Sequence, residues 1–587
     1  MKGGMHFYRG SGAGAARYFD EGHRGAEAYY TEQSRAVVEI DTWHSGERLG
    51  TTRLAEAGEL ARWVEGIDPA TGEVKGVIRA GGADRQPLRF VEMVVNNPKS
   101  LSIVASQNPA VALAYDALLA RQADEIARYL SRVAVTRIGP RGAQREVGNL
   151  SVETARVKHL TSREGDPHRH VHLMLNARVM TPDGTWHGLH SAALRQHIGA
   201  VNAIGSRILV TDASFRAVLR AEGYTLGDDG EINEARGAVA LFSKRTVRVA
   251  VNRGRIEATW RAEHPGEVPS QRQRNAWDHQ AWTEGRAAKG RAETPEELSE
   301  RVRSELGAAG FDFRPGRRSV TVQEPSVSVA QVQRDELAER AVAVLSSEKS
   351  AWSTAELTAE VERAVAASGV VGDPQAVTEL AEDVGARARA RCISLLDPSR
   401  QTPTAMSRYL SSEQVREADL SLNLGLAGLA GGEGVREEEA VAKARAAGLD
   451  VGQAEAVGAL CSTRRLETVI GPAGSGKTTM LGLAKEHLEA GGRRLVVVAP
   501  TLKAAQVAAG ELGAETSSLH KLLHANGWRW DELGRFSRLA PGDTDPSTGT
   551  IHRGPAERYA LGAESVLVVD EAGLLTVDEA NALIALV

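Results

Sequence analysis

The spacing of hydrophobic positions predicts both helices and strands in the first half of the chain. Residues 109–133 repeat apolar side chains every three or four positions, which is the pattern of a long amphipathic helix. Residues 169–179 alternate in character, as expected of a strand with one face in a core. The segment ETARVKH and the apolar residues 89–95 predict two more strands, and residues 191–223 predict another helix. This part of the chain is therefore expected to be an α+β domain.

The pattern changes further along the chain. Residues 303–448 are charged and helical in period, with breaks rich in proline, and we expect a helical connector there. From residue 449 an apolar segment, LETVI, enters a glycine-rich loop, and SVLVV predicts a second strand, which together favour an α/β domain. The sequence thus predicts a multidomain α/β protein with domains at residues 1–302, 303–448 and 449–587.

Composition excludes several classes of protein. The formal net charge of −5 means that any nucleic-acid surface must be a local basic patch. Cys392 and Cys461 are far apart, so neither a disulfide framework nor a zinc ribbon is expected. No long apolar run or signal sequence is present, and we expect a cytoplasmic protein without membrane insertion. The basic run after Phe242 fits a single-strand-binding rim and fits a plain charged helix equally well.

Histidines mark the first candidate site. His170 and His172 lie two apart and share one face of their strand, while Val171 and the other odd-numbered residues turn toward a core. His159 closes the neighbouring strand, so three imidazoles can converge on one metal ion and leave its other positions open. Solvated histidines on an exposed sheet face are the alternative, and His168 is a spare candidate ligand.

Two further kinds of residue bear on this site. Tyr18, Tyr29 and Tyr30 lie near the N-terminus, and a tyrosine hydroxyl becomes a useful nucleophile only beside a metal or a base. The alternative is that these tyrosines pack within a helix. Glu92 lies on the strand that Pro98 closes, and by itself it fits a carboxylate on the solvent side of a half-buried strand.

The order H-x-TSR-xx-DP-xx-HxH-xxx-N, from His159 to Asn176, resembles the metal motif of MobF-type conjugative relaxases in the HUH endonuclease superfamily. The resemblance implies an α+β relaxase domain with a central antiparallel sheet and a divalent metal, Mg, Mn or Zn, at the three histidines. It further implies that Tyr18 cleaves DNA, that Tyr29 or Tyr30 assists, and that Glu92 supports the histidines where the family more often has Asp.

The same resemblance implies a reaction and partners. The tyrosine would form a 5′-phosphotyrosine link to one DNA strand and leave a 3′ hydroxyl, so that a second nucleophile can reverse the step. Expected partners are single-stranded and hairpin DNA at a plasmid origin of transfer, together with accessory conjugation and coupling proteins.

A second site follows residue 470. Gly471, Gly476, Lys477 and Thr478 fit GxxxxGK[ST], a loop whose backbone N–H groups and lysine hold nucleotide phosphates while the threonine hydroxyl binds Mg²⁺. Gly474 and Thr479 belong to the same loop. Asp570 and Glu571 end an apolar strand, where they would hold Mg²⁺ and orient water. ATP with Mg²⁺ is the expected cofactor.

The segments between these motifs resemble RecD-like superfamily 1 helicases, and Gln453 matches their adenine-reading glutamine. The resemblance implies a RecA-like first lobe. Because the sequence stops at Val587, before a second lobe, we expect weak ATP binding without DNA unwinding.

Two alternatives to a relaxase joined to a helicase module stay open. One is a His-ligated metal hydrolase fused to a P-loop module, in which the tyrosines are structural. The other is a catalytically degenerate protein that binds a DNA hairpin and recruits partners. A covalent DNA adduct, hydrolytic products, or tight binding without cleavage would distinguish the three.

Overall fold

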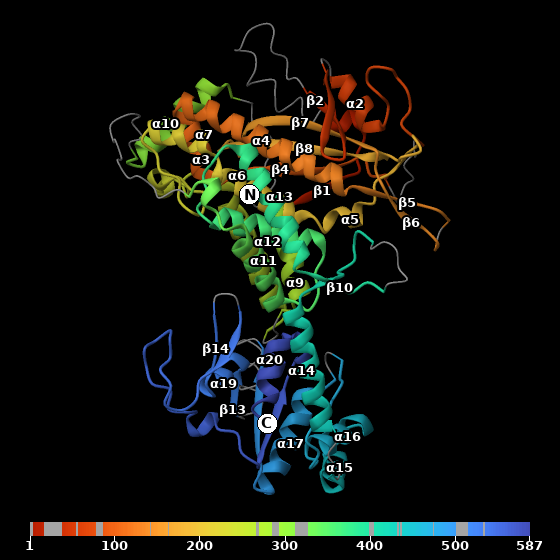
Figure 1. The fold of residues 1–587 in the computed structure, drawn as a ribbon, viewed down its shortest axis with the longest axis vertical. Helices are drawn as coiled ribbons and strands as arrows, with labels where there is room; N and C mark the ends of the chain where they lie inside the picture. The colour runs from red at the N-terminus through yellow and green to blue at the C-terminus, as the bar shows by residue number, and fades with distance from the viewer. Residues whose placement is uncertain are drawn as a thin grey trace. The chain divides into compact units, whose positions relative to one another are not determined.

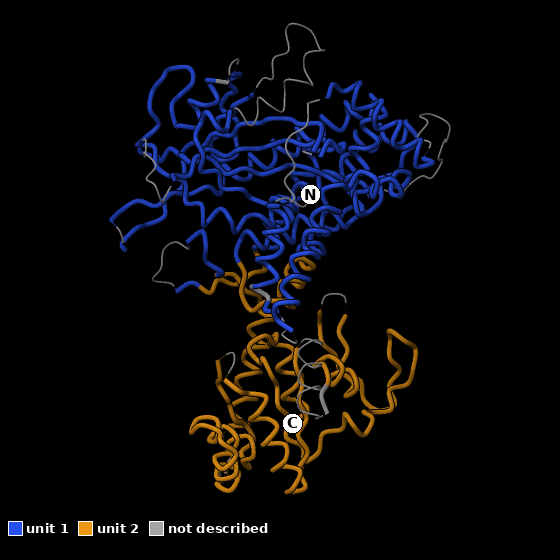
Figure 2. The backbone as a smooth tube through the Cα atoms, turned by 180° about the vertical axis from the view of Figure 1, so that it is seen from behind, with its two compact units in different colours: residues 1–338, 353–389, 396–408 blue, residues 339–352, 390–395, 409–587 orange. Residues whose placement is uncertain are grey.

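The structure is a computed structural model. It describes residues 4–16, 38–54, 57–77, 86–140, 142–162, 164–265, 269–284, 293–311, 327–397, 404–430, 434, 437–472, 475–500, 515–531 and 534–587. The chain forms two compact units (Figure 2). The first consists of residues 1–338, 353–389 and 396–408, and the second of residues 339–352, 390–395 and 409–587.

Strands and helices alternate irregularly in the first unit (Figure 1). Its strands are β1 (Met5–Tyr8), β2 (Val38–His44), β3 (Glu47–Leu54), β4 (Phe90–Val95), β5 (Val135–Ile138), β6 (Arg145–Gly148), β7 (Ser151–Thr161), β8 (Pro167–Met180) and β9 (Trp186–Gly188). Its helices are α2 (Ala57–Glu65), α3 (Lys99–Gln107), α4 (Pro109–Val133), α5 (Ser191–Arg195), α6 (Ile198–Thr211), α7 (Ala213–Ala221), α8 (Lys244–Glu263), α9 (Gln271–Glu284), α10 (Pro295–Ala308), α12 (Thr354–Ala367) and α13 (Pro374–Ala390), with short 3₁₀ helices η1 (Asn233–Ala238) and η2 (Val329–Gln331).

The remaining elements run through the second unit, and α11 (Arg334–Glu348) spans the division between the units. They are β10 (Ile393–Ser394), β11 (Leu410–Ser411), α14 (Glu413–Ala430), α15 (Glu438–Ala446), α16 (Val451–Leu460), α17 (Lys477–Ala490), β12 (Arg494–Ala499), β13 (Glu515–Ser518), α19 (Leu519–Ala525), β14 (Trp528–Trp530), β15 (Phe536–Arg538), η3 (Glu557–Tyr559), β16 (Ser565–Val569), η4 (Ala572–Leu574) and α20 (Val577–Ile584).

An antiparallel sheet organises the first unit. Its strands follow the order β1-β4-β8-β7-β2-β3, and β9 pairs with β8. The apolar face of α4 covers one side of this sheet, where Leu118 and Ile126 pack in one buried cluster with Val171, Leu173 and Leu175. The amphipathic helix and the alternating strand predicted from the sequence are therefore confirmed, with the odd-numbered side chains of β8 in the core.

The opposite face of the sheet has its own, smaller core. Trp63 of α2 and Phe90, Val157 and Met174 of the sheet are buried together, and Ala15 joins them from the helical residues 12–16. Even-numbered side chains of β8 and odd-numbered side chains of β7 point to this side, because residues two apart in a strand share a face. The histidines identified in the sequence therefore lie on this face, beside the core.

The single helix predicted for residues 191–223 is wrong. This stretch forms α5, α6 and α7. The break before α6 falls at His197, and the break before α7 falls at Asp212, whose extended backbone lets its carboxylate accept a hydrogen bond from the Phe215 N–H at 2.9 Å. Capping by Asp stabilises a new helix start, so it interrupts an otherwise continuous apolar pattern.

Helices from the predicted connector pack within the first unit. Leu306 of α10 shares a buried cluster with Ile103 of α3, and Ala359 of α12 packs on Ala200 and Ala203 of α6. The domain boundaries at residues 302 and 448 remain a prediction, but the structure shows that part of the stretch between them completes the first unit.

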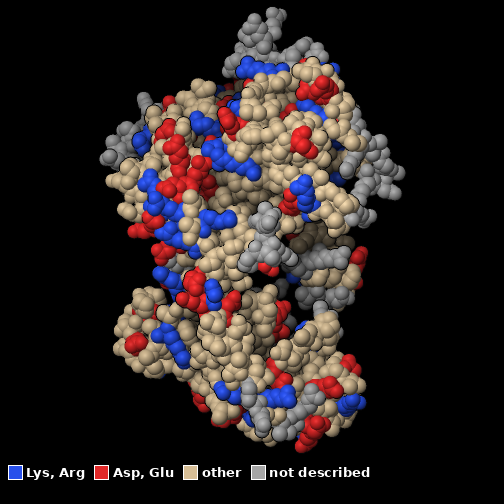
Figure 3. All heavy atoms as spheres, turned by 45° about the vertical axis from the view of Figure 1, so that its right-hand side comes forward, with Lys and Arg blue, Asp and Glu red and all other residues tan. Residues whose placement is uncertain are grey.

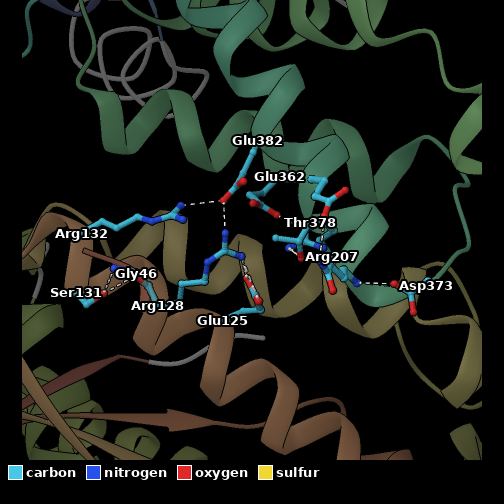
Figure 4. A network of polar contacts seen from close by, with 12 residues as sticks. Gly46, Glu125, Arg128, Ser131, Arg132, Arg207, Glu362, Asp373, Thr378 and Glu382 are labelled. Atoms are coloured by element: carbon cyan, nitrogen blue, oxygen red, sulfur yellow. Dashed lines mark hydrogen bonds and ion pairs between the residues drawn. The ribbon is translucent and has the colours of Figure 1, made fainter. Parts of the chain in front are cut away.

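Charged side chains join α12 and α13 to α4 and α6 (Figure 4). Arg207 of α6 is 1% exposed, and its Nε donates to Glu362 of α12 at 2.5 Å. On α13, Glu382 accepts from Arg128 at 2.7 Å and from Arg132 at 2.8 Å, and both arginines belong to α4. The contact between Arg207 and Glu362 is buried, whereas the contacts of Glu382 are partly exposed. Loss of one partner should therefore affect the stability of the unit more at the Arg207–Glu362 contact than at Glu382.

A parallel sheet with the order β13-β12-β16 lies in the second unit. Buried residues of α15, α16 and α17 pack on one side with Leu495 and Val497 of β12, and Leu519 and Leu583 pack on the other with Val498. This is the predicted α/β arrangement. The expectation that LETVI is a strand is wrong, because residues 466–470 carry no strand assignment. Both sides of β12 are already occupied by β13 and β16.

The basic run that follows Phe242 forms α8. Its arginines pair with carboxylates: Arg248 lies 2.9 Å from Glu164, and Arg253 lies 2.7 Å from Asp278. These pairs favour the plain charged helix of the two alternatives. On the face shown in Figure 3, Lys and Arg side chains likewise lie among Asp and Glu side chains.

Two simpler predictions from composition can be compared with the structure. Cys392 and Cys461 form no disulfide, as expected from their separation. Among the described residues, none of the helices has the length and apolar character needed to cross a membrane.

Candidate metal centre and nucleotide loop

Three histidines converge on the sheet face opposite α4. His159 of β7 is the register partner of His170 of β8, and His172 follows on the same face. His172 Nε2 lies 3.1 Å from His170 Nε2 and 3.1 Å from His159 Nδ1. One ring nitrogen of each histidine falls within 4.8 Å of the others, and within the described part of the chain this is the group of side chains that could hold a metal ion.

The outer nitrogens of two of these rings are already engaged. His170 Nδ1 lies 2.6 Å from the carbonyl oxygen of His168, and His172 Nδ1 lies 2.5 Å from Glu92 Oε1. Because an oxygen acceptor requires a donor, Nδ1 of each ring carries the proton, and Nε2 presents its lone pair to the centre. This is the tautomer that a metal ligand needs, and the three nitrogen donors fit a divalent transition metal.

Burial keeps the imidazole of His170 neutral. The pKa of His170 is lowered well below its usual value by burial, and the neighbouring His168, His172 and His159 lower it further. His168 stacks on His170 with ring centroids 4.6 Å apart, and burial lowers the pKa of His168 to about 3. A neutral imidazole binds a metal without first losing a proton. His168 itself lies outside the converging set.

Glu92 supports the centre from β4. Burial by itself raises the pKa of Glu92, but hydrogen bonds and charge from His172 and His6 outweigh it and lower that pKa to about 2. The carboxylate is therefore ionised and is a weak base at neutral pH. This favours an orienting role for Glu92 over removal of the tyrosine proton.

His6 is a contact that the sequence reasoning missed. It lies on β1 directly opposite Glu92, and its Nδ1 is 3.4 Å from Glu92 Oε2. The alternation of apolar and polar side chains in residues 5–8 was the signal in the sequence that a strand is present there. It does not reveal that β1 pairs with β4, so the partner of His6 could not be identified.

Three predicted catalytic tyrosines precede β2 in the chain. Tyr18, Tyr29 and Tyr30 lie outside the described residues, so their assignment as nucleophiles stays a prediction. The described chain before them ends at Ala16, and Ala15 is buried on the same face of the sheet as the histidines. Gly12 is held there as well, because its N–H donates to Glu65 Oε1 at 2.6 Å.

His187 and His190, which the sequence did not favour as ligands, have other partners. His187 Nε2 lies 2.7 Å from the Thr185 hydroxyl, and His190 Nδ1 lies 3.0 Å from Glu146. Neither belongs to the converging group.

The nucleotide loop in the second unit leads directly into α17. Gly476 adopts φ +73°, which favours glycine, and α17 begins at Lys477. Lys477 Nζ donates to the carbonyl oxygens of Gly471 at 2.9 Å and Pro472 at 3.3 Å. Thr478 and Thr479 follow in the first turn of α17, where backbone N–H groups and the helix dipole favour an anion. Gly474 lies outside the described residues.

The other predicted nucleotide residues come from separate elements. Gln453 is in the first turn of α16, and its Nε2 donates to the Ser475 carbonyl at 2.9 Å, which ties α16 to the loop. Asp570 follows β16, and its N–H donates to Val498 of β12 at 2.9 Å. Glu571 has a positive φ of 58°. The structure thus joins Gln453 to the loop and places Asp570 at the carboxyl end of the sheet, while their roles stay predictions.

This arrangement defines an enzyme that pairs a histidine-based metal centre with a separate phosphate-binding module. The chain belongs to the TrwC relaxase family, whose model matches residues 12–309, about half of the sequence. A model described as an AAA domain matches residues 448–587. The protein is thus a relaxase with a helicase-like AAA module, in agreement with the predicted relaxase fold and enzyme class.

Several solved structures are similar to the first part of the chain. A conjugative relaxase TrwC with OriT DNA, in a metal-bound form, shares 20% identity, covering 53% of this chain and 100% of its own, with a TM-score of 0.40. A copper-bound form of that complex has 21% identity, the same coverage and a TM-score of 0.39. TrwC with a 27-mer DNA comprising the recognition hairpin and the cleavage site has 19% identity, again the same coverage, and 0.37. A search of curated proteins found no match.

Proposed function

We propose that this protein nicks one DNA strand at a plasmid origin of transfer and passes that strand to a second acceptor, which initiates conjugative transfer. Membership of the TrwC relaxase family supports the class of reaction. The single observation that carries the proposal is the convergence of one nitrogen each from His159, His170 and His172 beside the ionised Glu92.

The proposed step is a transesterification. The oxygen of Tyr18 forms a bond to phosphorus, and the bond from phosphorus to the 3′ oxygen breaks. The tyrosine proton passes to solvent or a nearby base, and the leaving 3′ oxygen gains a proton. The product is a 5′-phosphotyrosine and a free 3′ hydroxyl, and because the ester bond is retained, a second hydroxyl reverses the step. Tyr29 or Tyr30 is the proposed second nucleophile.

The residues of the chain divide the remaining tasks. His159, His170 and His172 would hold a divalent metal, Mg, Mn or Zn, and when bound it supplies positive charge that offsets charge developing on the phosphate. Glu92 accepts a hydrogen bond from the Nδ1–H of His172 and keeps Nε2 of that ring directed at the centre. The pair of β7 and β8 fixes the spacing of the three rings, because His159 and His170 are register partners.

The proposed partners follow from the same reaction. The similar solved TrwC structures hold OriT DNA, in one case with a recognition hairpin. We infer that this chain binds single-stranded and hairpin DNA at its own origin of transfer, and that accessory and coupling proteins meet it there. Plasmid DNA is in the cytoplasm, which is therefore the proposed location.

The AAA module would supply nucleotide binding. In the proposal Gly471, Gly474 and Gly476 wrap the phosphates, Lys477 reaches the β- and γ-phosphates, and Thr478 with Asp570 holds Mg²⁺. Thr479 lies beside Thr478, Glu571 orients water, and Gln453 reads adenine. The close approach of the loop carbonyls to Lys477 Nζ supports a lysine already turned into the phosphate site.

Incubation with single-stranded oligonucleotides and Mg²⁺ or Mn²⁺, followed by denaturing gels, tests the proposal. A covalent protein–DNA adduct that disappears in Tyr18→Phe supports it, and Tyr29→Phe and Tyr30→Phe identify the second nucleophile. Hydrolytic products without an adduct would instead indicate a metal hydrolase. Tight hairpin binding without cleavage would indicate a degenerate relaxase.

A further inference from the structure

We propose that His6 is a positioning residue for the metal centre and acts through Glu92. The inference rests on the proposed function of the three-histidine site. His6 and Glu92 are direct cross-strand partners in the pairing of β1 with β4, so their side chains lie on the same face of the sheet. His6 Nδ1 is 3.4 Å from Glu92 Oε2.

The two carboxylate oxygens of Glu92 serve different partners. Oε1 lies 2.5 Å from His172 Nδ1, and Oε2 faces His6. A glutamate side chain has three rotatable bonds, so a single contact leaves the plane of the carboxylate free to turn. A second contact on the other oxygen fixes that plane. His6 therefore holds Oε1 where His172 needs it.

Exposure separates the roles of the two histidines. The side chain of His172 is 6% exposed, that of Glu92 is 13% exposed, and that of His6 is 61% exposed. His172 is thus buried at the centre, Glu92 lies between the two histidines, and His6 contacts Glu92 from the solvent side. Because His6 is exposed on a short edge strand, replacing it leaves no cavity and tests the contact without loss of the fold.

The strand that carries His6 is anchored at its C-terminal end. β1 ends at Tyr8, and Ala15 packs beside Phe90 on the same face of the sheet. Tyr8 stacks on Phe90 with ring centroids 4.5 Å apart. Tyr8 and Phe90 are cross-strand partners two residues along from His6 and Glu92, so the stacking anchors β1 to β4 beside that pair. The edge strand is therefore held firmly enough to act as a support.

The test compares His6→Ala and His6→Gln with the wild-type chain. Mn²⁺ affinity is measured by isothermal titration without DNA, and cleavage is measured as Mn²⁺ is raised. Removal of partners that orient metal ligands commonly weakens metal affinity by about 10–100-fold. His6 acts one contact further out, so we expect a loss of about tenfold or less for H6A. We expect recovery in H6Q, whose amide N–H can donate to Glu92 Oε2, and recovery of H6A cleavage at high Mn²⁺.

The same His6 substitution in an E92Q variant tests whether His6 acts through Glu92. In E92Q the added H6A substitution should change Mn²⁺ affinity little, because the carboxylate through which His6 acts is already gone. His187→Ala, on β9 of the same sheet, serves as the matched control and should bind Mn²⁺ like the wild type. Unchanged affinity in H6A, or an equal loss in the wild-type and E92Q backgrounds, would overturn the inference. Normal Mn²⁺ binding by the wild type without any DNA adduct would overturn the proposed function alone.

Discussion

Glu92 Oε1 lies 2.5 Å from His172 Nδ1, although the register of β4 and β8 places Glu92 directly opposite Met174. His172 is therefore a diagonal neighbour of Glu92, and diagonal pairs in a sheet are separated by about 7–8 Å between Cα atoms. The longer glutamate arm spans this separation. Glu92 is therefore long enough to reach His172 from the diagonal position.

Shortening that arm should weaken the centre. In Glu92→Asp the carboxylate stays charged but should no longer reach His172 from the diagonal position. We expect Mn²⁺ affinity to fall by about tenfold, at the lower end of the range for partners of metal ligands, and cleavage to fall with it. Isothermal titration measures the first and adduct formation the second. Wild-type affinity in E92D would mean that the contact with His172 is not needed.

Single replacement of the three converging histidines should distinguish ligands from neighbours. His159→Ala, His170→Ala and His172→Ala should each reduce metal affinity at least about 100-fold, because three protein ligands leave no substitute for a lost one. His187→Ala, whose ring is bound to Thr185, should keep wild-type affinity. Metal content after dialysis against Mn²⁺ or Zn²⁺ gives the comparison. Full loading of any of the three ligand variants would exclude that histidine from the centre.

Removal of one partner of the buried ion pair should destabilise the first unit. Glu362→Ala leaves the guanidinium of Arg207 buried without its carboxylate, and losses of about 3–5 kcal/mol are typical of such changes. The double variant Arg207→Met with Glu362→Leu should regain most of that stability. Urea unfolding followed by tryptophan fluorescence measures the free energy.

Glu382→Ala is the matched control for that experiment. Glu382 also accepts from arginines of α4, but its side chain is 46% exposed, so the expected loss is below about 1 kcal/mol. Equal losses for Glu362→Ala and Glu382→Ala would show that burial of the Arg207 pair has no special weight in holding α12 to α6.

Nucleotide binding should depend on one lysine of α17. Lys477→Ala removes the amine that now contacts the Gly471 carbonyl at 2.9 Å, and ATP binding should become undetectable by titration. DNA nicking should be unchanged, since the metal centre belongs to the first unit. Lys485→Ala on the same helix, which removes a partly exposed pair with Glu489, should bind ATP normally. ATP binding by K477A at wild-type affinity would contradict the assigned loop.

A buried histidine away from the metal centre should make the first unit sensitive to acid. His197 Nδ1 lies 2.7 Å from the Tyr129 hydroxyl, and burial lowers the pKa of His197 from 6.5 to about 4. The unfolded state therefore binds more protons between these values, so stability present above pH 6.5 is lost as the pH falls toward about 4. The loss is at most roughly 3 kcal/mol.

Urea unfolding from pH 7.5 to 4, with chelator present to remove metal effects, measures this dependence. His197→Gln cannot gain the proton, so it should show a smaller fall in stability over the same range. An identical slope in the variant and the wild type would mean that other groups carry the whole effect.

The sequence by itself determined the features that depend on residues close to one another along the chain. The spacing within residues 109–133 is a local helical period, and the parity of His170 and His172 follows from the two-residue repeat of a strand. The glycines and Lys477 of the nucleotide loop are contiguous, so their chemistry could be recognised from the sequence as well. His159 joined this set as the last residue of the neighbouring predicted strand, ETARVKH.

Only the tertiary structure decided the contacts between distant segments. The pairing of β1 with β4 brought His6 to Glu92, and α12 brought Glu362 to Arg207. It also left LETVI outside the described strands. The physical reason is that strand pairing and helix docking are chosen by the burial of complementary surfaces across the whole unit, and local periodicity does not record which surfaces will meet.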